Sequence, residues 1–514
     1  MAEPPRSRPD TDRPTDGQVA VLVFTALLAL GVVVLRGYHP LGTIGGFISP
    51  HYGMALHFAA EGTVGKGGEP TVFKPPGYPV FGGLLLRAAL GAPSFEPERS
   101  PRGIAPDWQW LVPPWVPAYL ARGVGVLHAA QLVCVAAAAA LLFLWLARLT
   151  SRGAALTGAL LFGANPGTLA IAGTVHYAVL HLTLIVAGGL LLQRGLDDVT
   201  PRRGRLVAAG IVWGLATLVR PIALLLPPVA AVAIGLLVRP ARRGAAAWSW
   251  LVLGMALVVA PYAARNLALS GRLIPVNAQA WAALFSATAR KASAQPNHFR
   301  YKEVREEQME VQSRVAARTL DEAWEPYDVE NNLALESAYR AAALENLRQR
   351  PGVYLYNLGQ STLTLLLDMP TIYVDLFCRK QRSPHRWPQW YWPGTPQDAL
   401  RTWSGGLFLA GTRVLTALGA LGLWIALRRR DRALLAPLAV AVTLGAAHAL
   451  TWMDVTYYYV KLPFLVIFGL YGLDRALGGA PGALWGRTAL ARLALGAVLV
   501  SGLAGTVAML VWSR

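Results

Sequence analysis

Long runs of apolar residues, separated by short polar segments, dominate this chain. Eleven such runs are present, at residues 19–35, 122–147, 153–172, 174–193, 205–220, 222–238, 246–264, 405–427, 433–450, 457–473 and 488–512. Most are close to or above the roughly 17–25 residues that a membrane-spanning helix needs. Because isolated strands would leave backbone groups unpaired in lipid, the runs predict an all-α polytopic membrane protein of about 11–12 transmembrane helices.

The composition excludes an ordinary soluble protein. Hydrophobic residues make up 54% of the 514 residues and charged residues only 15%, which is too apolar for average soluble usage. The formal charge is +19, but Lys and Arg lie mostly in short clusters between apolar runs. This pattern disfavours nucleic-acid binding and favours membrane topology, anionic phospholipid or a phosphate-bearing substrate. Cys134 and Cys378 lie in a span and a distant loop, so they indicate neither a disulfide framework nor a metal site.

The basic clusters predict the orientation. Residues 1–17 are polar and Pro-rich and are expected to be a disordered cytoplasmic tail, and residues 18–36 read as the first transmembrane helix, an uncleaved signal anchor. With the N-terminus inside, four basic clusters fall on the inner side. These are Arg148 with Arg152, Arg194 with Arg202, Arg203 and Arg205, Arg239 with Arg242 and Arg243, and Arg428, Arg429 and Arg430 with Arg432.

The same topology divides the rest of the chain. Residues 37–118 become the first extracytoplasmic loop and residues 119–264 a transmembrane bundle. Residues 265–351 are rich in acidic residues and helix formers and predict surface helices that form an extracytoplasmic lid. Residues 352–403 are interpreted as a re-entrant or interfacial segment, with a missed twelfth crossing as the alternative. Residues 404–514 carry the C-terminal transmembrane helices.

Several motifs occur in one order along the chain. The first loop carries Tyr52 and the run Lys74-Pro75-Pro76-Gly77-Tyr78-Pro79. A glycine-bearing span ends in Arg220-Pro221, and a later segment reads Pro261, Arg265-Asn266, Gly271-Arg272 and Pro275-Val276. The last motifs are Arg350-Pro351-Gly352-Val353-Tyr354 and Tyr457-Tyr458-Tyr459-Val460-Lys461-Leu462-Pro463. Together they resemble bacterial glycosyltransferases of the dolichyl-phosphate-mannose–protein mannosyltransferase type, in the aminoarabinose transferase-like superfamily.

The resemblance implies the fold of the C-type glycosyltransferases, a polyprenyl-phosphate sugar donor, and an inverting transfer on the outer face of a bacterial inner membrane. A lipid-linked sugar phosphate has an anionic leaving group, which guanidinium groups bind bidentately while they stabilise its developing charge. Snorkelling or helix capping is the competing explanation for any single basic residue. The candidate phosphate-binding residues are Lys74, Arg220, Arg265, Arg272 and Lys461.

Transfer to a hydroxyl needs a general base. Members of the family usually have an acidic residue a few positions before the loop tyrosine, where this chain has Ile48, Ser49, Pro50 and His51. His51 is chemically able to act as a base, although such a histidine is more often structural. Glu61 and Glu69 are the nearest carboxylates and are the other candidates. His176 and His181 are five residues apart, a poor spacing for one helix face, so a metal pair is not indicated.

Alternative functions remain open at this level. The chain has no nucleotide-binding loop, zinc-type His-Glu-x-x-His pattern or Gly-x-Ser-x-Gly elbow. The lack of nucleotide-binding motifs fits a lipid-linked sugar as the expected donor, because such a donor needs none. A non-catalytic relative that binds or flips lipid-linked sugar is the second hypothesis. A polytopic transporter is the third, and it predicts internal repeats and mid-span ionisable residues. The sugar, the acceptor (protein, lipid or glycan), the metal dependence and the oligomeric state are not determined by these patterns.

Overall fold

A computed structural model describes eleven segments of the chain: residues 14–36, 50–66, 69–93, 117–173, 175–197, 201–289, 307–315, 329–367, 414–429, 431–450 and 458–478. These segments are almost entirely helical, which confirms the predicted all-α class. The two-residue strands β1 (Gly65–Lys66) and β2 (Glu69–Pro70) form a small antiparallel hairpin within the first loop.

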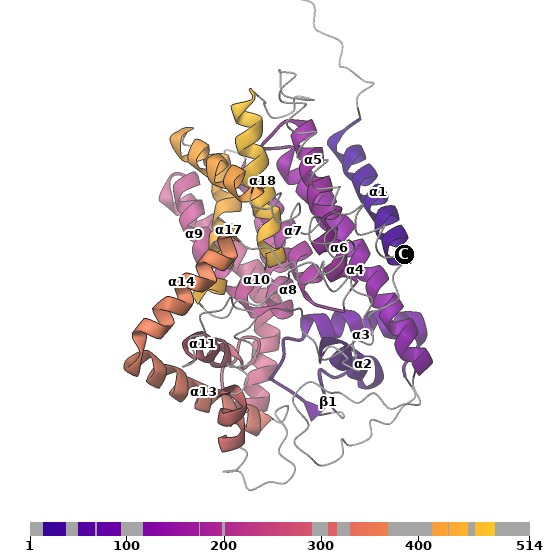
Figure 1. The fold of residues 1–514 in the computed structure, drawn as a ribbon, viewed down its shortest axis with the longest axis vertical. Coiled ribbons are helices and arrows are strands. Elements are labelled where there is room, and N and C mark those ends of the chain that lie inside the picture. The colour runs from indigo at the N-terminus through magenta and orange to yellow at the C-terminus, as the bar shows by residue number, and fades with distance from the viewer. Residues whose placement is uncertain are drawn as a thin grey trace, which may run out of the picture.

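The helices of the first half are α1 (Asp16–Arg36), α2 (Pro50–Glu61), α3 (Gly77–Leu90), α4 (Pro117–Leu146), α5 (Arg152–Gly163), α6 (Pro166–Ala172), α7 (Ala178–Leu196), α8 (Arg203–Val219), η2 (Pro221–Leu225), α9 (Leu226–Leu237) and α10 (Ala241–Ser270). Those of the second half are α11 (Ala280–Thr288), helix 307–315, α13 (Val329–Gln349), α14 (Pro351–Leu367), helix 414–429, η3 (Arg432–Leu434), α17 (Leu435–Leu450) and α18 (Tyr458–Ala476). Figure 1 shows most of them running roughly along the long axis.

Among the described residues, four helices are long and apolar enough to cross a membrane: Asp16–Val33, Arg122–Leu146, Ala178–Leu196 and Ala241–Ser270. Three shorter apolar segments accompany them at Gly77–Leu90, Pro221–Leu237 and Arg432–His448. The predicted span 153–172 is broken into α5 and α6. The break has a local cause, because Asn165 Oδ1 accepts hydrogen bonds from the backbone of Gly167 and Thr168 at the start of a new helix. The predicted span 488–512 lies outside the described residues.

Small residues let the central helices approach closely. A Cβ at Gly210 on α8 would overlap the backbone of Leu251 on α10, and a Cβ at Gly254 would overlap the backbone of Val207. On α7, Gly188 and Gly189 make room for the buried rings of Trp213 and Trp145. Membrane helices associate through this kind of close packing, because lipid supplies little hydrophobic driving force between them.

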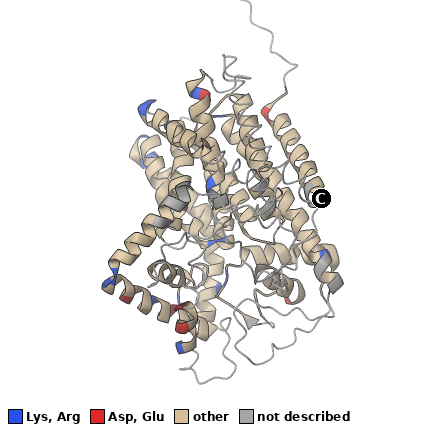
Figure 2. Ribbon diagram, viewed as in Figure 1, with Lys and Arg blue, Asp and Glu red and all other residues tan. Residues whose placement is uncertain are grey.

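One end of the bundle gathers the basic clusters. Arg152 Nε lies 2.8 Å from the Asp16 carboxylate at the start of α1, and Arg148 pairs with Asp197 at the end of α7. Asp474, near the end of α18, accepts a 2.6 Å hydrogen bond from the Ser151 hydroxyl. The end of α1 that carries Asp16 and the end of α18 that carries Asp474 therefore lie on the same side (Figures 1 and 2). Which side of the membrane this end faces remains a prediction.

The opposite end holds parts of the predicted first loop and of the predicted lid. Figure 1 shows α2, α3 and β1 at the same end as α11 and α13. The Glu336 carboxylate of α13 accepts a 2.9 Å hydrogen bond from the Trp281 backbone in the first turn of α11. Asn357 of α14 donates to the Ala287 carbonyl at 2.8 Å. These contacts hold α11, α13 and α14 together. Residues 368–403 of the segment interpreted as re-entrant or interfacial lie outside the described residues.

Candidate functional site

Helix α2 positions His51 by burying its other face. Tyr52, Ala55 and Leu56 are buried in a small apolar core with residues of α3 and α4. Tyr52 is only 2% exposed, and its ring packs against Gly123 of α4. Burial raises the pKa of Tyr52, so its phenol stays neutral. Tyr52 is therefore a packing residue whose role is to orient α2.

His51 lies in a cluster of aromatic rings. Its ring centroid is 4.6 Å from that of Tyr177, 5.6 Å from that of His176 and 6.0 Å from that of Tyr78, all in edge-on geometry. Tyr78 belongs to the predicted loop motif. His176 and Tyr177 lie in the turn between α6 and α7, and sequence analysis did not assign them to the site.

Arg220 reaches the same cluster from the end of α8. The following Pro221 disfavours helical geometry in the residue before it, and Arg220 has an extended backbone with φ −152° and ψ 118°. Its side chain is only 9% exposed. The guanidinium carbon lies 5.5 Å from the centroid of the Tyr177 ring, and its charge acts on His51 and His176. The Arg-Pro motif thus ends a helix and leaves a cation inside the protein.

Two more buried histidines lie within reach of the Arg220 charge. His181 of α7 is fully buried, and His448 of α17 is 1% exposed. The charge of Arg220 acts on both imidazoles. Neither residue belongs to a motif. Helices α7, α8 and α17 therefore converge on this guanidinium.

Lys74 lies in the turn between β2 and α3. Its half-buried ammonium group is 3.5 Å from Gln279 Oε1 and 4.6 Å from the centroid of the Phe73 ring, and its charge acts on His51. Pro75 and Pro76 lead into the first turn of α3. The first residue of α3, Gly77, touches the last turn of α8, because a Cβ there would lie 2.6 Å from the Val219 nitrogen.

The segment that carries Lys74 is held by the chain after α10. The Ala278 backbone donates to the Val72 carbonyl at 2.9 Å, and the Asn277 amide donates to the Phe73 carbonyl at 3.1 Å. Arg265 donates at 3.2 Å to the Thr71 carbonyl. Arg265 also donates to Tyr262 and Asn266 of its own helix. These contacts make Arg265 a brace between α10 and the Lys74 loop.

Replacing Asn266 by alanine should loosen this brace. Asn266 is fully buried, and its Nδ2 donates to the carbonyls of Ile274 at 3.0 Å and Val276 at 2.9 Å. An unsatisfied buried carbonyl costs roughly 1–3 kcal/mol. We expect Asn266→Ala to lower the melting temperature of the purified protein by several degrees. Leu273→Ala is the control, since Leu273 lies in the same loop and is 74% exposed. An equal fall in melting temperature in both variants would show that the hydrogen bonds of Asn266 do not hold this segment in place.

The remaining predicted residues belong to α2, to the loop after α10, to α18 and to β2. Glu61 ends α2, about 15 Å along the helix from His51, and its carboxylate lies 3.6 Å from Nδ1 of His57. The side chain of Arg272 is exposed. Lys461 is half-buried in the first turn of α18. The backbone of Glu69 forms part of β2, and its side chain lies outside the described residues. Ile48 and Ser49 also lie outside them.

The imidazoles nearest the cations are neutral. Burial, together with the neighbouring His176, Lys74 and Arg220, holds the pKa of His51 well below its ordinary value. Burial and the Arg220 charge lower the pKa of His176 to about 3. Both are therefore unprotonated near neutral pH and able to accept a proton or a hydrogen bond. Within the described ranges, no group of three or more His, Cys, Asp and Glu side chains is arranged to hold a metal ion.

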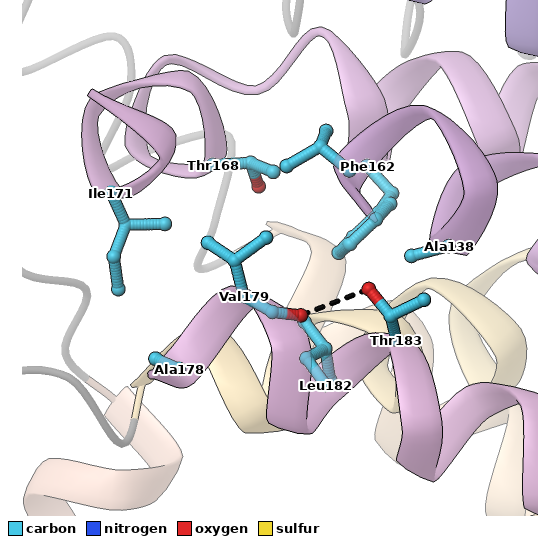
Figure 3. Close-up of a pocket in the computed structure, with 9 residues that line it drawn as sticks. Ala138, Phe162, Thr168, Ile171, Ala178, Val179, Leu182 and Thr183 are labelled. Atoms are coloured by element: carbon cyan, nitrogen blue, oxygen red, sulfur yellow. Dashed lines mark hydrogen bonds between the residues drawn. The ribbon is translucent and has the colours of Figure 1, made fainter. Parts of the chain in front are cut away.

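A small apolar cavity adjoins the site. It lies among α4, α5, α6 and α7, and its lining includes Phe162, Ile171, Val179 and Leu182 (Figure 3). The Thr183 hydroxyl in its wall donates a 2.9 Å hydrogen bond to the Val179 carbonyl. The same hydroxyl also lies 3.0 Å from the Cys134 carbonyl oxygen, a second backbone acceptor. The cavity therefore offers apolar surface rather than chemistry.

No known family model matches the chain, and no curated protein is similar to it in sequence. Solved structures are similar in fold. The archaeal oligosaccharyltransferase AglB from Archaeoglobus fulgidus, in complex with an inhibitory peptide and a dolichol-phosphate, aligns with 96% of this chain at 12% identity and a TM-score of 0.50. ArnT from Cupriavidus metallidurans, bound to undecaprenyl phosphate, aligns with 90% of this chain and 79% of its own length at 14% identity and a TM-score of 0.36.

The alignment with the oligosaccharyltransferase concerns the fold. It covers 56% of that protein, so the chain spans little more than half its length. Identity this low says nothing about which residues act. The predicted resemblance to C-type glycosyltransferases is confirmed at the level of the fold.

Proposed function

We propose that the protein is a glycosyltransferase that moves a sugar from a polyprenyl-phosphate-linked donor to an extracytoplasmic acceptor at the outer face of a bacterial inner membrane. The observation that carries the proposal is that the charges of Lys74 and Arg220 both act on His51. Two cations beside a neutral base suit a reaction that expels a phosphate and removes a proton from a hydroxyl. The fold is in keeping with this chemistry.

The two cations have complementary properties. A guanidinium binds phosphate oxygens bidentately, whereas an ammonium group acts as a mobile point charge. Arg220 is almost fully buried, and Lys74 is half-buried in the loop just before α3. Charge interactions are stronger where water is excluded. In the proposed complex, Arg220 holds the phosphate and Lys74 covers it from the loop side.

The proposed reaction is a single displacement. The acceptor hydroxyl oxygen forms a bond to the anomeric carbon, and the bond from that carbon to the phosphate oxygen breaks. The electron pair leaves with the phosphate, whose charge Arg220 and Lys74 stabilise, and the hydroxyl proton passes to His51. The anomeric configuration is inverted. In the protein without bound lipid, His51 is a weak base. The negative charge of a phosphate bound beside it opposes the positive charges that lower the pKa of His51.

The predicted topology supports a site outside the cell. The basic clusters around Arg148, Arg152 and Arg194 lie at the end of the bundle that carries the start of α1, and the positive-inside rule assigns that end to the cytoplasm. Helix α2, which carries His51, and helix α3, which begins just after Lys74, lie with α11 and α13 at the other end (Figure 1). Lipid-linked sugars and envelope acceptors are accessible on that side.

The experiment compares two lipids that differ by one phosphate. Purified protein in nanodiscs is titrated with undecaprenyl phosphate and with the uncharged alcohol undecaprenol. We expect the phosphate to bind at least about tenfold more tightly, because two cations contact it. Equal affinity would overturn the donor site. A panel of undecaprenyl-phosphate sugars then tests transfer through release of undecaprenyl phosphate, and binding without any release would favour a carrier-binding protein.

A further inference from the structure

In the turn between α6 and α7, hydrogen bonds hold both the backbone and the side chain of His176. The backbone nitrogen of His176 donates to Gln131 Oε1 at 3.1 Å, and the ring atom Nδ1 accepts from the Ala178 backbone at 3.1 Å. Gln131 is fully buried in α4, and its Nε2 donates to the Ala172 carbonyl at 3.1 Å. One glutamine therefore ties together both sides of the turn that presents His176.

These contacts determine the tautomer of His176. A nitrogen that accepts a hydrogen bond from a backbone N–H must have a free lone pair, so in a neutral ring the proton is on Nε2. Burial and Arg220 keep the pKa of His176 at about 3, so the ring is neutral near pH 7. No described residue accepts a hydrogen bond from Nε2, and the side chain remains partly exposed. His176 thus presents a neutral donor.

The ring of His176 lies against the groups of the donor site. Its centroid is 5.6 Å from that of His51 and 4.1 Å from that of Tyr177. The guanidinium carbon of Arg220 lies 5.5 Å from the centroid of the Tyr177 ring. A further cation here would be repelled by Arg220, whereas a neutral N–H adds a phosphate contact without that penalty.

We propose that His176 is a phosphate-binding residue, whose Nε2–H donates a hydrogen bond to a phosphate oxygen of the polyprenyl-phosphate carrier beside Arg220. This inference rests on the proposed function and deepens it. It assigns to the turn before α7 a substrate contact that no sequence motif indicated. The proposed contact also gives the hydrogen bond at Nδ1 a purpose, because that bond keeps the proton on Nε2, where it can be donated to the phosphate.

Two substitutions separate substrate binding from the structural role of His176. In His176→Asn, the amide oxygen can still accept from Ala178, but no donor reaches the position of Nε2. In His176→Gln, the amide nitrogen reaches that position, but nothing replaces Nδ1. We expect the Asn variant to keep the wild-type melting temperature and to bind undecaprenyl phosphate about tenfold more weakly. The Gln variant should melt earlier and bind with nearly wild-type affinity.

Two controls keep the outcomes distinct. Wild-type affinity in His176→Asn would overturn the inference, whereas failure of the wild-type protein to distinguish undecaprenyl phosphate from undecaprenol would overturn the proposed function instead. Imidazole nitrogen NMR of the lipid-free protein, with the signal assigned by its loss in His176→Asn, tests the tautomer without any ligand. We expect a neutral ring protonated at Nε2 at pH 7, and protonation at Nδ1 or at both nitrogens would also overturn the inference.

Discussion

Replacing Arg220 by glutamine should reduce the affinity for undecaprenyl phosphate by about 10- to 100-fold, the effect of losing roughly 1.5–3 kcal/mol from a charged hydrogen bond. Arg220 is 9% exposed, and its charge acts on His51, His176, His181 and His448. Glutamine removes this charge but keeps a polar side chain. Titration of the nanodisc-embedded variant with undecaprenyl phosphate measures the change in affinity.

The matched control for Arg220 is Arg203→Gln at the other end of α8. Arg203 stacks on Trp250, with its guanidinium carbon 5.5 Å from the ring centroid. We expect this variant to bind undecaprenyl phosphate like the wild type. Arg220→Lys should fall between the wild type and Arg220→Gln, because lysine keeps the charge and loses the fork of donors. Unchanged affinity in Arg220→Gln with an intact melting temperature would exclude Arg220 from the phosphate site.

Replacing Gly77 by alanine should weaken undecaprenyl phosphate binding indirectly, by displacing the helix end that carries Arg220. A Cβ on Gly77 would lie 2.6 Å from the Val219 nitrogen and 2.7 Å from the Leu218 carbonyl carbon. Both are backbone atoms of the last turn of α8, so neither can move aside as a flexible side chain would. Either α3 or the end of α8 must shift, and this turn leads directly into Arg220. Overpacking of this kind costs about 1–3 kcal/mol.

We therefore expect Gly77→Ala to lower the melting temperature by several degrees and to weaken undecaprenyl phosphate binding by about tenfold or more. Gly125→Ala on α4 is the matched control, because nothing lies within 4 Å of a Cβ at that position. Alanine in this helix should be neutral or slightly stabilising. If Gly77→Ala behaved like Gly125→Ala, the contact between α3 and α8 would not position the site.

One motif could be interpreted correctly from the sequence because its effect is local. Proline restricts the residue before it, so Arg220-Pro221 predicts the end of a helix with an arginine at its boundary. The sequence assigns the run Pro75-Pro76-Gly77 to a loop, and the structure shows that helix α3 begins at Gly77. The sequence did not show that these two boundaries touch. That contact depends on the packing of α3 against α8, which no local pattern encodes.

The predicted base and its surroundings show the same limit. His51 was selected by its position before Tyr52, and the structure places it beside Lys74 and Arg220. Glu61 was selected by proximity along the chain, but the helical rise of α2 places it about 15 Å away. His176 was set aside because its spacing from His181 does not suit a metal pair. The predicted topology already placed the turn before α7 on the outer side, and that was the available signal.

The sequence by itself determined that the chain forms membrane helices, where its basic clusters lie along the chain, and that a helix ends at Arg220. These properties follow from apolar run length, charge and backbone restriction, which act over a few neighbouring residues. Only the tertiary structure decided that the rings of His51 and His176 pack together within the field of Lys74 and Arg220, and that Arg265 braces the Lys74 loop. Such contacts join residues far apart in the chain, and they arise from the close packing of whole helices, made possible by glycines at their crossings.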